Sequence, residues 1–209
     1  MATFEAIQQR VSSRLKDANN VDVSVSDVSA TINDAIRYWS KRRFIFNTFR
    51  ETVDLNPGDA TVPALSITPL EVFETDGMVI DYANQKWPLK KISSEEYDDM
   101  DSQGRGTPFV WVYRNNSYEV YWLPDQDYTV VVRGIKKYDN LVNNVDTNDF
   151  TDNAEDLIIY EALARLMAEF RQDEKMEAYY SARAKDEYKN HKREVNKQIG
   201  TGRLQIRGL

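Results

Sequence analysis

The hydrophobic residues of this 209-residue chain change their spacing twice, and this limits the folds that the chain can adopt. Over residues 3–18, and again from about residue 24 to 46, apolar residues recur every three or four positions, as in amphipathic helices. Short alternating segments follow from residue 48, and the helical spacing returns after residue 152. The sequence therefore predicts an α+β protein, mainly a helical bundle, in which two N-terminal and two C-terminal helices flank a central antiparallel β insert.

The predicted helices cannot bury their apolar faces in isolated pairs, so we expect all four to pack on one another. Residues 157–170 are apolar around most of a helix circumference, which predicts a buried helix. Ser24 and Ser26 are candidate N-caps, and Gln172-Asp173-Glu174 is expected to form a tight reversal. The remaining apolar stripes are Phe4, Ile7, Val11 and Leu15, then Val28, Ile32, Ile36 and Trp39, and finally Met176, Tyr180, Ala184, Tyr188 and Val195.

The middle of the chain reads as short strands and turns. Residues 109–113 and 117–122 flank Arg114-Asn115-Asn116, and because Asn tolerates positive φ we expect a hairpin here. Residues 128–135 are rich in β-branched side chains and predict a further strand, whereas residues 62–70 read as an irregular link. We therefore expect a discontinuous helical bundle formed by residues 1–47 and 152–199, a β-rich insert over residues 48–151, and an extended C-terminal docking tail over residues 200–209.

Charge is distributed unevenly along the chain. Eight bases and three acids lie between Arg183 and Leu209, so this end carries +5 while residues 1–182 carry −12. An acidic body with a basic end suggests head-to-tail self-association or docking on an acidic partner. A solvated helix end, where bases favour the helix dipole, explains the same pattern equally well.

The residues needed for catalysis are mostly missing. The chain has no cysteine, which excludes thiolate nucleophiles, disulfides and cysteine-based zinc sites. Its single histidine, His191, has no nucleophile beside it in sequence, and we expect a packing or surface role for it. Gly104-Arg105-Gly106 lacks the lysine and spacing of a phosphate-binding loop. We therefore predict no enzyme, catalytic residue, cofactor or metal site, and rank a small hydrolase that uses acids such as Glu95 and Asp98 last.

Two basic clusters are candidates for contacts with DNA in a channel or with a neighbouring subunit. Aromatic neighbours permit stacking on bases, but a body with a charge of −12 repels phosphates, so we favour a role in covering the helical bundle. The clusters consist of Lys41, Arg42 and Arg43, and of Lys189, Lys192 and Arg193.

The last residues alternate in polarity, as an extended strand does, and we expect no later residue to bury them. A disordered terminus is one interpretation, but we favour a segment that docks on another protein, because disordered ends rarely carry such alternation. The candidate binding residues are Arg203, Leu204, Gln205, Ile206, Arg207 and Leu209.

Several segments resemble, in order and spacing, the adaptor or head-completion proteins of tailed bacteriophages. The resemblance covers nearly the whole chain, although no single segment is diagnostic. The segments are Tyr38-Trp39-Ser40-Lys41-Arg42-Arg43-Phe44, residues 52–60, residues 92–98, Gly106-Thr107-Pro108, residues 122–128, residues 155–163 and residues 172–175.

This resemblance implies a structural virion protein at the head-to-tail junction, made in the bacterial cytoplasm. Such adaptors form a ring, usually of twelve copies, beneath the portal protein. The ring extends the channel for double-stranded genomic DNA and offers its far rim to a tail nozzle or tail-completion protein. The C-terminal segment commonly runs along the portal, and no membrane contact is expected. The alternative is a DNA-binding packaging or regulatory protein of a phage.

Overall fold

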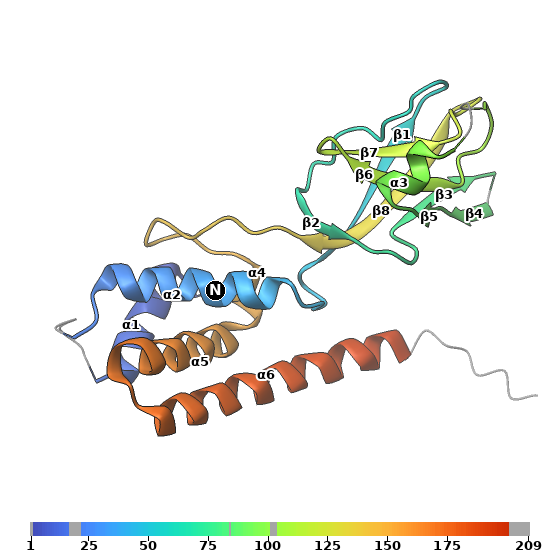
Figure 1. The fold of residues 1–209 in the computed structure, drawn as a ribbon. Coiled ribbons are helices and arrows are strands. Elements are labelled where there is room, and N and C mark those ends of the chain that lie inside the picture. Colours follow the sequence, from blue (N-terminus) through green and yellow to red (C-terminus); the bar gives the residue numbers. More distant parts are fainter. Residues whose placement is uncertain (1, 17–21, 84, 101–103, 201–209) are drawn as a thin grey trace, which may run out of the picture. The chain divides into compact units, whose positions relative to one another are not determined.

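The computed structural model describes residues 2–16, 22–83, 85–100 and 104–200 (Figure 1). Their contacts divide the chain into two compact units, one from residues 1–47 and 138–209 and one from residues 48–137. Helices form the first unit and two small sheets dominate the second, so the predicted α+β class is confirmed. We refer to them as the helical unit and the β unit.

The helical unit has a common apolar core. Its elements are α1 (Phe4–Arg14), α2 (Val25–Ser40), α4 (Asp149–Asn153), α5 (Glu155–Leu166), the π-helix η1 (Met167–Arg171) and α6 (Glu174–Gly200). The Ser24 hydroxyl caps α2 by accepting a hydrogen bond from the Asp27 amide, as predicted. Helix α5 is buried on most of its surface, and α1, α2 and α6 each bury one stripe in the same core.

The connection from α5 to α6 corrects one prediction. The helical spacing predicted that Phe170 is buried, but 43% of this residue is exposed. It lies in η1, whose wider turn rotates the side chains that follow out of the α-helical register. The chain then reverses at Gln172, where φ is 50°, and α6 begins two residues later.

Residues 138–151 belong to the helical unit by their contacts, whereas we expected the β insert to extend over residues 48–151. The Asn33 side chain makes two hydrogen bonds to the Leu141 backbone. Its Nδ2 donates to the Leu141 carbonyl at 3.0 Å, and its Oδ1 accepts from the Leu141 amide at 2.8 Å. The Leu141 side chain is buried, and the Asp146 carbonyl accepts a hydrogen bond from the Phe4 amide. Leu141, Val142 and Val145 show no clear helical or strand spacing, so periodicity gave no sign that Leu141 alone is buried.

The β unit contains a five-stranded sheet and a three-stranded sheet. The larger sheet has the order β1-β8-β3-β4, and β2 also pairs with β8; the smaller has the order β5-β6-β7. The elements are β1 (Thr48–Leu55), β2 (Pro69–Val72), β3 (Met78–Tyr82), β4 (Gln85–Pro88), β5 (Lys90–Lys91), α3 (Ser94–Asp98), β6 (Val110–Arg114), β7 (Ser117–Tyr121) and β8 (Tyr128–Lys136).

Strand β8 is the centre of the larger sheet. It pairs with β1 along its length, with β3 over its first half and with β2 over its last residues. A Cβ atom on Gly134 would lie 2.1 Å from the Glu71 carbonyl oxygen and 2.8 Å from a Phe49 ring carbon, so only glycine fits between β1 and β2. The residues around Pro69 therefore form a paired strand with a bulge, not the irregular link that we predicted.

The smaller sheet contains the predicted hairpin. Strands β6 and β7 pair around Asn115 and Asn116, whose φ angles of 50° and 59° fit a tight two-residue turn. Strand β5 pairs with β6 in parallel over two residues, which is the one departure from antiparallel pairing among the described strands.

Candidate functional site

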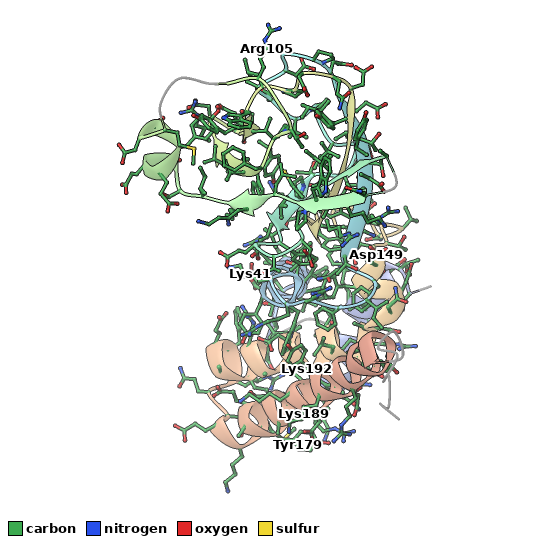
Figure 2. The ribbon with its side chains drawn as sticks, turned by 90° about the vertical axis from the view of Figure 1, so that its right-hand side faces the viewer. Lys41, Arg105, Asp149, Tyr179, Lys189 and Lys192 are labelled. Atoms are coloured by element: carbon green, nitrogen blue, oxygen red, sulfur yellow. The ribbon has the colours of Figure 1, made fainter. Side chains whose placement is uncertain are left out.

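Helix α6 and the end of α2 bring the two predicted basic clusters to one region of the helical unit. Lys41, Arg42 and Arg43 directly follow α2, whereas the second cluster lies on α6. All six side chains are exposed, and Figure 2 shows Lys41, Lys189 and Lys192. We call this group of six cations, Lys41, Arg42, Arg43, Lys189, Lys192 and Arg193, the basic surface.

Aromatic side chains join the two clusters. The ring centroids of Trp39 and Tyr188 are 5.0 Å apart, and those of Phe44 and Tyr188 are 5.7 Å apart. The His191 ring meets Phe44 edge-on at 5.8 Å. These contacts are the physical reason why residues about 150 positions apart in sequence lie close together.

A second group of rings supports Phe44 from the other side. Phe44 and Phe46 stack at 5.0 Å, and Phe150 meets both rings edge-on. The Tyr138 ring packs on Phe150, and its hydroxyl donates a 2.7 Å hydrogen bond to Asp149. Burial, together with this bond to the Asp149 carboxylate, raises the pKa of Tyr138, so its hydroxyl stays neutral.

Asn47 holds the loop that carries the first cluster. Its side chain is fully buried, and its Oδ1 accepts a 2.8 Å hydrogen bond from the Phe44 amide. Its Nδ2 donates to the Ser40 carbonyl at 3.3 Å and to the Arg42 carbonyl at 2.7 Å. The sequence analysis missed this residue; the only available signal was a polar side chain that directly follows an aromatic and basic run.

Local acids neutralise part of the positive charge. Lys189 pairs with Asp186 at 3.0 Å, and the hydrogen bond from Lys189 lowers the pKa of the Asp186 carboxyl. Glu194 lies on the same helix, 3.9 Å from His191. Lys41 and Lys192 are both exposed to solvent.

The surroundings of His191 indicate packing, as predicted. Only 21% of its side chain is exposed, and it helps to line a hollow of about 190 Å³. The other lining residues are Phe44, Ile45, Phe46, Asn153 and Glu194. None of these supplies a nucleophilic hydroxyl or thiol, so the described residues of this hollow do not assemble a nucleophile–base pair.

The clustered acids of the β unit stabilise local structure. The Glu96 carboxylate accepts a hydrogen bond from the Ser93 amide, and Ser93 caps Glu96 in return. This bond lowers the pKa of Glu96. Asp98 pairs with Arg114 at 2.6 Å, and Arg114 also pairs with Glu119 at 2.7 Å. These contacts give Glu96 and Asp98 structural roles.

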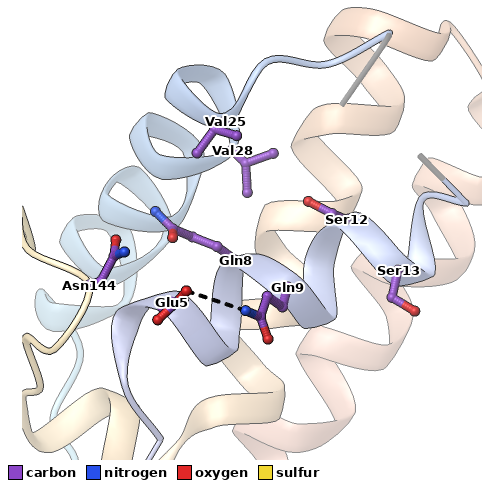
Figure 3. Close-up of a pocket in the computed structure, with 8 residues that line it drawn as sticks. All are labelled: Glu5, Gln8, Gln9, Ser12, Ser13, Val25, Val28 and Asn144. Carbon is purple, nitrogen blue, oxygen red and sulfur yellow. Dashed lines mark hydrogen bonds between the residues drawn. The ribbon is translucent and has the colours of Figure 1, made fainter. Parts of the chain in front are cut away.

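A hollow of about 400 Å³ lies between α1 and the start of α2 (Figure 3). Its lining is mostly hydroxyl, amide and valine groups, with Glu5 as the single titratable side chain. Glu5 accepts a hydrogen bond from Gln9, and Gln8 donates one to Ser29. A lone carboxylate among neutral groups does not form an acid–base pair. The lining residues are Glu5, Gln8, Gln9, Ser12, Ser13, Val25, Val28 and Asn144.

Several predicted features lie outside the described residues. These include the proposed docking residues Arg203, Leu204, Gln205, Ile206, Arg207 and Leu209. Across the described part of the chain, no group of three or more histidine or acidic side chains is arranged to hold a metal ion. No helix within that part is both long and apolar enough to cross a membrane.

A family model matches nearly the whole chain. The family model described as SU10 adaptor protein matches residues 2–205, and therefore spans both units. No curated protein matches the sequence significantly.

Proposed function

Since the chain belongs to the SU10 adaptor protein family, and is thus a structural adaptor protein of a bacteriophage, we propose that it forms the ring beneath the portal. In this proposal a dodecameric ring extends the channel for genomic DNA and provides the platform to which the tail nozzle or tail-completion protein attaches. The family match over nearly the whole chain is the observation that carries the proposal.

The C-terminal residues are the proposed portal contact. Helix α6 ends at Gly200, and residues 201–209 follow it with two arginines and three apolar residues in alternation. A segment that orders on binding loses conformational entropy, so a single copy should bind weakly. Many copies in a ring compensate through avidity, and we therefore expect a monomer in isolation that assembles on the portal.

Portal binding tests this proposal directly. Deletion of residues 200–209 should abolish binding to immobilised portal rings, and Leu204→Asp with Ile206→Asp should weaken it at least tenfold. Thr201→Ala is the matched control, because Thr201 is not one of the proposed docking residues and its replacement keeps the arginines and the apolar residues. Undiminished portal binding by the deleted chain would refute the tail as the contact. Class averages of the mixture should show one adaptor ring on each portal.

The basic surface favours a second role, which is contact with DNA in the channel or, alternatively, with the neighbouring subunit. Cations from α6 and from the loop after α2 lie around one aromatic cluster, and exposed lysines and arginines contact phosphates without sequence preference. The same observation supports the alternative of a DNA-binding packaging or regulatory protein. An adaptor should bind duplex DNA only weakly in isolation, whereas a dedicated DNA-binding protein should bind it tightly at physiological salt.

The salt dependence of DNA binding separates these roles. If the six cations contact phosphates, the logarithm of the affinity should fall against the logarithm of the salt concentration with a slope of roughly −5. Replacement of Lys41, Arg42 and Arg43 by glutamine should make that slope shallower by about 3, because three phosphate contacts are lost. Lys86→Gln, in the β unit, is the control. A gel shift without binding at low salt would remove DNA as a partner and leave the neighbouring subunit.

A further inference from the structure

Four large aromatic side chains are exposed at one end of the β unit. They are Tyr82, Trp87, Phe109 and Trp122, with exposed fractions of 36%, 38%, 45% and 42%, and we call them the aromatic rim. Exposed groups of rings mark binding surfaces more often than scattered aliphatic residues do, because tryptophan and tyrosine dominate the energetics of protein interfaces.

The strand register places these rings together. Leu55 pairs with Tyr128 and Asp81 with Thr129, so β1 and β3 end where β8 begins. The amide of Gly106 donates to the Leu123 carbonyl and attaches the segment before Phe109 to the same end. The Tyr82 ring centroid lies 6.4 Å from that of Trp87 and 5.3 Å from that of Tyr128. The Tyr128 hydroxyl is hydrogen-bonded to the Thr107 hydroxyl at 2.9 Å. Two residues further along the chain, the Phe109 ring centroid lies 5.3 Å from that of Trp122.

The rim is held in a defined position although it is exposed. Trp122 lies against two glycines: a Cβ atom on Gly106 would be 3.0 Å from its Cε3, and one on Gly104 would be 3.2 Å from its Nε1. The Tyr82 hydroxyl donates to the Gln126 side chain, whose amide donates to the Tyr128 hydroxyl. A partner therefore meets rings that are already ordered, and little side-chain entropy is lost on binding.

The charge around the rim indicates the chemistry of that partner. Residues 48–137 contain 15 acids and 9 bases, a net charge of −6. At the end that carries the rim, five acids accompany three bases, Lys86, Lys90 and Arg105; Figure 2 shows Arg105 in the β unit. Acidic charge beside exposed rings attracts cations and repels nucleic-acid phosphates. The acids are Asp54, Asp59, Asp81, Asp125 and Asp127.

We propose that the aromatic rim binds an extended, arginine- or lysine-bearing segment of the protein that follows the adaptor in the assembly. The cationic side chains lie over the faces of Trp87 and Trp122, and the aspartates around the rim balance their charge. This inference deepens the proposed function and rests on it, since it names the chemistry by which the adaptor recognises its tail partner.

A peptide of known charge tests the rim with the full chain. The probe is a fluorescein-labelled Gly-Arg-Gly-Arg-Gly-Arg-Gly peptide, and binding is followed by fluorescence anisotropy at low salt. Trp122→Ala should weaken binding about tenfold, and Gly106→Ala should also weaken it, because the added Cβ displaces the indole. Tyr113→Ala is the matched control, since 49% of Tyr113 is exposed but it lies on the β6–β7 hairpin. Trp87→Ala replaces Trp122→Ala if circular dichroism shows that the latter is unfolded.

The outcomes are distinct. Equal binding by the wild type and by folded Trp122→Ala and Trp87→Ala would overturn the proposal, as would equal binding of a peptide with glutamate in place of arginine. Competition by a single-stranded oligonucleotide would assign the rim to nucleic acid. Tighter binding of a peptide of residues 203–209 than of the probe would assign it to a second copy. Failure of the wild type to bind the portal would instead refute the proposed function, because the peptide assay needs no portal.

Discussion

Replacing Asn47 by alanine should destabilise the helical unit more than most single substitutions do. The change removes a fully buried side chain that makes three hydrogen bonds, and it leaves the buried Phe44 amide without its acceptor. An unsatisfied buried donor costs about 1–3 kcal/mol, and each neutral hydrogen bond contributes about 1 kcal/mol net. Because the bond to the Arg42 carbonyl is only partly buried, water recovers part of that loss. We expect a decrease of about 3 kcal/mol in the free energy of unfolding.

Urea denaturation followed by circular dichroism at 222 nm measures this loss. For a chain of this size, about 3 kcal/mol also lowers the melting temperature by roughly 6–12 °C. Asn190→Ala is the control: Asn190 is exposed on α6, and its loss should change the stability by no more than about 0.5 kcal/mol. Asn47→Asp keeps an acceptor for Phe44 but turns an oxygen toward two carbonyls, so it should be at least as destabilising. Stability of Asn47→Ala within about 1 kcal/mol of the wild type would refute the role assigned to the buried amide.

Two further predictions concern the β unit. Burial, with a smaller effect of Tyr113, raises the pKa of Tyr118 to about 12. The neutral Tyr118 hydroxyl therefore stabilises the folded state fully below about pH 10, which is the pKa in the unfolded chain. This stabilisation is lost as the pH rises toward 12. Urea midpoints between pH 9 and 11.5 should therefore fall less steeply for Tyr118→Phe, and identical slopes would contradict this. Arg114→Ala should cost about 1 kcal/mol, because it removes the pairs with Asp98 and Glu119 and a cation–π contact with Tyr97 at 4.4 Å. Lys86→Ala is the control in the same denaturation assay, and an equal effect of both changes would rule out a special role for Arg114.

Local sequence signals predicted the elements that local chemistry determines. The hairpin between β6 and β7 follows from two asparagines that adopt positive φ, and the reversal before α6 follows from a short polar segment. The buried character of α5 follows from apolar residues around its circumference. The interactions that decide the hairpin and the reversal lie within a few residues of one another, whereas α5 needs α1, α2 and α6 to cover it, and its sequence indicates only that it must be covered.

The features that the sequence did not predict depend on distant partners. Strand β2 exists because Gly134, more than sixty residues later, leaves room for it beside β8. The aromatic contacts of the basic surface join α2 to α6, and the pattern of either segment alone did not indicate them. Phe170 continues an apolar pattern, but the π-helix rotates it outward.

The pairing of Thr48 with Ile135 has a consequence for how such a protein evolves and folds. The roughly ninety residues of the β unit leave and rejoin the helical unit through chain ends that are already neighbours. Once β1 and β8 are paired, the insertion connects to the helical unit as a short loop would. Its loop-closure entropy is therefore that of a short loop and not that of a long insertion. A module attached in this way can be exchanged or rebuilt at little cost to the stability of the helical unit, so the exposed surface of the β unit can diverge while the helical unit stays unchanged.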